Sequence, residues 1–203
     1  MNYDEIMPAT PDYSCHRELL LKWLPILLYT AIAGIVMSLA TALLNANVVT
    51  TLLSSAVSLV MVVALWHLAP VNGRYRKAAI LSAVSVGAAI LIVLVPSLTL
   101  ITFAASICSI IASWQEMNAH SEITAPLNRN LAQKWRALFW WQMGIGLISG
   151  LASSVGVVIA VLADADQETI VMVTLLATVL VSAVFALIRI LYLKRTMALY
   201  QEG

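Results

Sequence analysis

Three side chains that could carry acid-base or metal chemistry lie close together in the polar segment from Ser113 to Trp141. Glu116 and His120 are four residues apart and share one face of a helix, and Glu122 follows shortly after them. A carboxylate beside an imidazole can move protons or hold a metal ion. A stable metal site needs three or four ligands, and no second ligand cluster accompanies these residues. We therefore expect solvated side chains, with no metal and no cofactor.

The remaining nucleophiles have no partner. Cys15 directly precedes His16, but consecutive helical residues do not face each other, so they form no thiolate and imidazole pair. Ser149 in "GLISG" would need a base at its own depth in the membrane, and every histidine lies at or beyond the inner boundary. The acidic turn at residues 164–168 is too short for a calcium site. The sequence predicts no catalytic residue.

The composition is that of a membrane protein. Hydrophobic residues make up 62% of the 203 residues, charged residues make up 10%, and the mean hydropathy is +0.94. A net charge of +1 gives no reason to expect a nucleic-acid partner. Acids and prolines precede the first apolar run, so we expect no cleaved signal peptide. Cys15 and Cys108 lie in different environments and predict no structural disulfide.

Six apolar segments are long enough to cross a bilayer, which takes about 20 helical residues each. The long run at 78–114 is interrupted by Pro96, which disfavours helix at Val95 and lacks a backbone donor, so we expect two short spans there. The predicted fold is all-α, a single six-span membrane domain at 23–193. Its spans lie at about 23–44, 48–69, 78–95, 98–114, 137–163 and 170–193, with cytoplasmic segments at 1–22, 115–136 and 194–203.

The distribution of cations orients the spans. With six spans, all 11 lysines and arginines fall on one side, which places both termini in the cytoplasm, whereas five spans would divide the cations almost equally. No Asp, Glu, Lys or His lies in the interior of any span, and Arg189 is near enough to the inner end of its span to reach the surface. This pattern excludes proton relays, ion-coupled pumps and voltage sensors.

A partial repeat supports six spans. When Lys22–Trp23 is aligned with Lys134–Trp135, Gly34 coincides with Gly146. The first and fifth spans would then have the same orientation. The corresponding interpretation of the architecture is a set of helical hairpins, each starting from a basic inner segment.

Small residues at four-residue spacing predict faces where helices approach closely, because little hydrophobic drive exists between helices in lipid. These packing faces are Gly34, Ser38 and Ala42 in the first span, and Gly146, Gly150 and Ser154 in the fifth.

Hydroxyl side chains form two further stripes, which either pack or line a path for a small uncharged solute. Such hydroxyls can also bond to the carbonyl four residues earlier, which leaves less free polarity. The stripes are Thr102, Ser106 and Ser109 in the fourth span, and Thr174, Thr178 and Ser182 in the sixth.

The segment that leads into the fifth span is amphipathic. Leu127, Leu131, Trp135 and Leu138 recur at helical spacing, and Asn128 is a suitable N-cap. We expect this helix to lie against the inner membrane surface. Tryptophans expected at headgroup depth are Trp23, Trp66, Trp114, Trp135, Trp140 and Trp141.

Three functions remain open. The packing faces favour a non-enzymatic accessory or scaffolding subunit that binds copies of itself or another membrane protein in the bilayer. The hydroxyl stripes favour a transporter or solute-binding component for a small neutral or apolar molecule, with a cavity among the second, fourth and sixth spans. Glu116, His120 and Glu122 would suit a lipid-modifying enzyme at the inner interface. We expect the first of these, in the plasma membrane, or in the cytoplasmic membrane of a prokaryote.

Overall fold

A computed structural model describes residues 16–43, 48–95, 99–162 and 167–202, with side chains except at 42–43, 93, 99–100, 149–162, 167–178 and 202. The long apolar runs form helices, which satisfy every backbone hydrogen bond within one segment. The helices are α1 (Arg17–Leu43), α2 (Val48–His67), α3 (Gly73–Leu94), α4 (Thr99–Thr124), α5 (Arg129–Leu162) and α6 (Gln167–Glu202). The prediction of an all-α six-helix bundle is confirmed.

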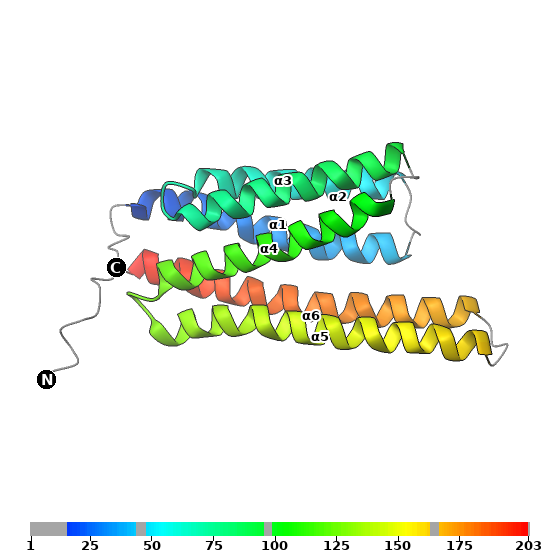
Figure 1. The fold of residues 1–203 in the computed structure, drawn as a ribbon. Coiled ribbons are helices and arrows are strands. Elements are labelled where there is room, and N and C mark those ends of the chain that lie inside the picture. The colour runs from blue at the N-terminus through cyan, green and yellow to red at the C-terminus, as the bar shows by residue number, and fades with distance from the viewer. Residues whose placement is uncertain (1–15, 44–47, 96–98, 163–166, 203) are drawn as a thin grey trace, which may run out of the picture.

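The six helices form a closed ring. Each packs against its neighbours in the chain, and α6 returns to pack against α1. Figure 1 shows α5 and α6 as a long antiparallel pair beside the group α1 to α4. The ring closes at the chain ends, where Arg17 Nε donates to the carbonyl oxygen of Tyr200 at 2.6 Å. The start of α1 and the end of α6 therefore lie at the same end of the bundle.

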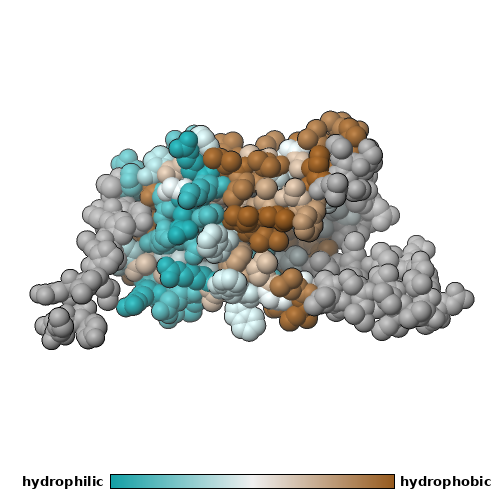
Figure 2. Space-filling view, viewed as in Figure 1, coloured by the Kyte–Doolittle hydropathy of each residue, from teal (hydrophilic) through white to brown (hydrophobic). Residues whose placement is uncertain are grey.

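Three helices are long and apolar enough to cross a membrane within the described residues: 17–41, 48–67 and 73–92. Large apolar side chains are exposed outside the ring, and Phe103 is 71% exposed. Figure 2 shows hydrophilic side chains gathered at one end and hydrophobic ones beside them. These features indicate a membrane protein, and the crossing of α4, α5 and α6 stays a prediction.

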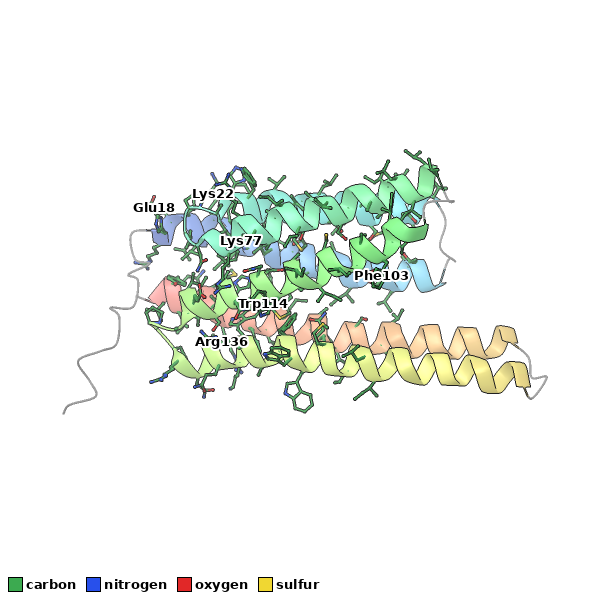
Figure 3. All side chains as sticks on the ribbon, in the orientation of Figure 1. Glu18, Lys22, Lys77, Phe103, Trp114 and Arg136 are labelled. Carbon is green, nitrogen blue, oxygen red and sulfur yellow. The ribbon has the colours of Figure 1, made fainter. Side chains whose placement is uncertain are left out.

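All eleven lysines and arginines are on segments that meet at one end of the bundle, here called the basic end. It comprises the start of α1, the turns between α2 and α3 and between α4 and α5, and the end of α6. In Figure 3, Glu18, Lys22, Lys77 and Arg136 lie towards this end, and Phe103 lies in the apolar part. The fully buried side chains also gather there, among them Leu20, Leu24, Leu65, Leu68, Tyr75, Ile123, Trp135 and Leu193.

The predicted cytoplasmic segment 115–136 is not a separate element. Helix α4 continues past the predicted end of its span to Thr124, and α5 runs unbroken from Arg129 to Leu162. The turn between them ends at Asn128, whose Oδ1 accepts from the backbone N–H of Leu131 at 2.9 Å, which confirms the predicted N-cap. Leu131, Trp135 and Leu138 of its apolar face are buried in the bundle, whereas Leu127 is 49% exposed, and contact of this segment with the membrane surface stays a prediction.

Candidate functional site

A buried charged cluster lies at the basic end. Glu116 is 4% exposed and His120 is fully buried. Arg189 of α6 donates from Nη2 to Glu116 Oε1, and His120 Nε2 lies 3.6 Å from the same oxygen. Tyr75 of α3 places its hydroxyl 2.9 Å from His120 Nδ1. The expectation that Glu116 and His120 are solvated is therefore wrong, and Arg189 reaches a carboxylate and not the surface.

Trp135 of α5 covers one side of this cluster. Its ring stacks on His120 with centroids 4.5 Å apart, and it meets Tyr192 edge-on at 5.5 Å. Its Nε1–H donates to Thr196 Oγ1 at 3.2 Å. Trp135 is fully buried, so its prediction as an interfacial anchor is wrong. Polar and aromatic contacts thus join α3, α4, α5 and α6 at one place.

The charges in the cluster balance. Burial alone would raise the pKa of Glu116, but the Arg189 guanidinium and His120 outweigh burial and lower that pKa to about 2. Burial lowers the pKa of His120, against the attraction of Glu116. At neutral pH the cluster therefore holds one ion pair and a neutral imidazole. We assign the imidazole proton to Nε2, with the Tyr75 hydroxyl donating to Nδ1.

A cavity of about 260 Å³ lies between α1, α2 and α6, with Arg189 at its basic end. The Arg189 guanidinium uses Nη2 for Glu116 and for Met61 Sδ at 3.8 Å. Its Nε–H is buried and makes no hydrogen bond. Arg189 therefore lines the cavity and also has a buried donor without a partner among the described residues; the cavity wall includes Gly34, Ser38, Ser58 and Ser182.

Gly34 and Gly146 of the predicted packing faces are not in close contact with another helix in the described part of the chain. A Cβ added at Gly34 or Gly146 would meet no atom within 4 Å. Gly34 and Ser38 line the cavity instead, and Gly146 is exposed on α5. The side chains of Ala42 and Ser154, and the surroundings of Gly150, lie outside the described residues.

The hydroxyl stripes are only partly brought together. Ser182 lines the cavity, whereas Thr102, Ser106 and Ser109 are exposed on α4 and do not line it. Ser106 donates to the carbonyl of Thr102 at 2.9 Å. The side chains of Thr174 and Thr178 lie outside the described residues. The observed cavity therefore lies between α1, α2 and α6, whereas the sequence predicted a cavity among the second, fourth and sixth spans.

Glu122 lies apart from Glu116 and His120. Arg74 Nε donates to Glu122 Oε1 at 2.7 Å, and Asn72 Nδ2 donates to Oε2 at 2.9 Å. These bonds tie the α2–α3 turn to α4 at the surface. Among the described residues, no group of three His, Cys, Asp or Glu could hold a metal ion. The three residues that suggested a lipid-modifying enzyme do not form one site.

The other tryptophans are at least partly exposed near the basic end. Trp23 stacks on His67 with centroids 4.0 Å apart. Arg74 lies 5.9 Å from the ring centroid of Trp114, and Arg76 lies 5.7 Å from that of Trp66. Placement of these rings, and of Trp140 and Trp141, at headgroup depth stays a prediction.

Comparison of the chain with protein-family models, curated proteins and solved structures finds no match. A functional conclusion therefore depends on the geometry of the cluster and the cavity. Sequence reasoning missed Arg189 as the partner of Glu116. The available signal was Arg189 itself, since a cation within a long apolar run requires a counter-ion.

Proposed function

We propose that the protein crosses the plasma membrane six times, with both termini in the cytoplasm. The gathering of every lysine and arginine at one end supports this orientation, because cytoplasmic loops are enriched in these residues. The closed ring supports six crossings, since each helix packs beside the one before it in the chain and runs in the opposite direction.

We propose that the cavity between α1, α2 and α6 binds a small, largely apolar, uncharged molecule that carries a hydrogen-bond acceptor. The place of Arg189 in the cavity wall carries this proposal, because its buried Nε–H has no partner among the described residues, and a solute acceptor that reached this donor would satisfy it. The balanced charge of Glu116 and Arg189 favours a neutral solute. The protein would then be a transport or solute-binding component.

Filling the cavity should abolish binding. In Gly34→Leu the new side chain has room to enter the cavity, because a Cβ at this position meets no atom within 4 Å. Gly87→Leu is the matched control, since Gly87 is equally open but lies on α3, away from the cavity. Native mass spectrometry after gentle solubilisation should find a retained small molecule on the wild type and on Gly87→Leu, and none on Gly34→Leu. An empty wild type, or retention by Gly34→Leu, would contradict the proposal.

An accessory or self-associating subunit is the second candidate function. The exposed Gly146, with open space beside it, supports this candidate, because a small residue lets a second helix approach closely.

Gly146→Leu should dissociate a complex that uses this face of α5. Gly144→Leu is the control, because Gly144 is also open but points to another side of the helix. The stoichiometry of each variant in native membranes can be counted by single-molecule photobleaching. Equal stoichiometry in the wild type and in both variants would exclude this face as the interface.

A further inference from the structure

An apolar groove runs along the contact between α5 and α6. It encloses about 550 Å³, and its lining includes Trp141, Ile145, Val184 and Ile188. The lining residue on α5 nearest the basic end is Lys134. The groove therefore begins at a cation and extends towards the apolar part of the bundle. It involves helix α5, whereas the solute cavity involves α1 and α2, so the two hollows are different features.

A second, polar hollow adjoins the groove at the basic end. It encloses about 410 Å³ and is lined by Asn128, Asn130, Lys134 and Arg195, among others. Lys134 lines both hollows, which therefore adjoin at this side chain. In the described part of the chain, neither Lys134 nor Arg195 has a carboxylate within salt-bridge distance. Of these two cations, Lys134 therefore lies where the apolar groove meets the polar hollow, and Arg195 lines the polar hollow.

We propose that these two hollows together bind one anionic phospholipid. The phosphate would lie between Lys134 and Arg195, next to the first turn of α5, whose positive end favours an anion. One acyl chain would occupy the groove between α5 and α6. A soluble phosphate would satisfy only the cations, and a neutral lipid would fill only the groove. An anionic phospholipid matches both parts, because its head group would lie in the polar hollow and its acyl chain in the adjoining groove.

The head-group part is tested by titrating the purified full-length protein with phosphatidylglycerol and phosphatidylcholine of the same acyl chains, followed by native mass spectrometry. Lys134→Gln combined with Arg195→Gln should weaken phosphatidylglycerol binding on the order of 30-fold and leave phosphatidylcholine unchanged. Arg76→Gln combined with Lys77→Gln removes the same charge from the α2–α3 turn and should change neither lipid. Unchanged phosphatidylglycerol binding in the first variant, or an equal loss in the second, would overturn the site.

The groove part is tested with Ala137→Trp, because Ala137 lines the groove and is itself exposed. This variant keeps both cations and should still lose phosphatidylglycerol at least tenfold. Soluble glycerol phosphate should compete poorly against the lipid. If Ala137→Trp binds the lipid as the wild type does, or if glycerol phosphate competes at the same concentration as the lipid, the site recognises only a phosphate and the proposal fails.

Discussion

Replacing Glu116 with alanine should destabilise the bundle by about 3–5 kcal/mol, because it leaves a largely buried guanidinium without its counter-ion. Arg189 is 22% exposed at its side chain, so water offers it little compensation. The measurement is chemical denaturation in detergent micelles followed by far-ultraviolet circular dichroism. Glu122→Ala is the control, since its partner Arg74 is about one-third exposed and the loss of that pair should cost no more than about 1 kcal/mol. Equal losses in the two variants would contradict the buried ion pair.

The same ion pair should make stability depend on pH. In the folded state the pKa of Glu116 is about 2, below its ordinary value of 4.5, so its stabilisation is complete above pH 4.5 and is lost as the pH falls towards 2. The lowered pKa of His120 adds a loss that begins below its ordinary value of 6.5, because the unfolded chain takes up that proton first. Glu116→Ala should lose less stability than the wild type between pH 4.5 and 2. Parallel profiles across that window would argue against the assignment.

Removing the indole of Trp135 should cost about 3–5 kcal/mol, because Trp135→Ala opens a cavity where the side chain is fully buried. The variant loses the stack on His120, the edge contact with Tyr192 and the hydrogen bond to Thr196. Unfolding is best followed by far-ultraviolet circular dichroism, since the substitution itself changes the tryptophan fluorescence.

Two matched variants separate the contributions at Trp135. Trp135→Phe keeps an aromatic ring and removes the Nε1–H donor, so its cost should be smaller, about 1–2 kcal/mol. Trp140→Ala removes an indole that is 68% exposed and should leave the unfolding midpoint nearly unchanged. If Trp135→Ala and Trp140→Ala unfold at the same midpoint, Trp135 is not part of the core.

Local sequence patterns were sufficient to predict the helices. Each predicted span corresponds to one observed helix and extends beyond it by at most two residues, and Pro96 falls between α3 and α4 in the chain as expected. The positions of the basic segments in the chain also predicted that these segments meet at one end of the bundle. These features depend on the composition and length of single segments, which one sequence shows directly.

The buried cluster was not predictable in the same way. Glu116 and His120 belong to a polar stretch, and polarity alone favours solvent exposure. Their burial depends on Arg189, which lies 73 residues away in the chain, and on Tyr75 and Trp135 from two other helices. Periodicity shows which residues share a face, but it does not show which helix covers that face.

The cavity depended on knowing which helices are neighbours. Gly34 and Ser38 were visible as a small-residue stripe, and Ser182 as part of a hydroxyl stripe. Only the return of α6 to α1 brings these residues together. A larger side chain opposite Gly34 would have filled this space, and the small-residue stripe of α1 would then have been a packing face.

The order of synthesis gives the ion pair a consequence for biogenesis. Glu116 is synthesised with α4, and its cation arrives only with α6, the helix that closes the ring. Until then the nascent bundle carries an uncompensated carboxylate and lacks Thr196, the acceptor for Trp135. An unfinished chain therefore carries an unpaired buried charge that a finished chain does not carry. We expect quality-control proteases and insertion chaperones that recognise such a charge to distinguish the two before the ring is complete.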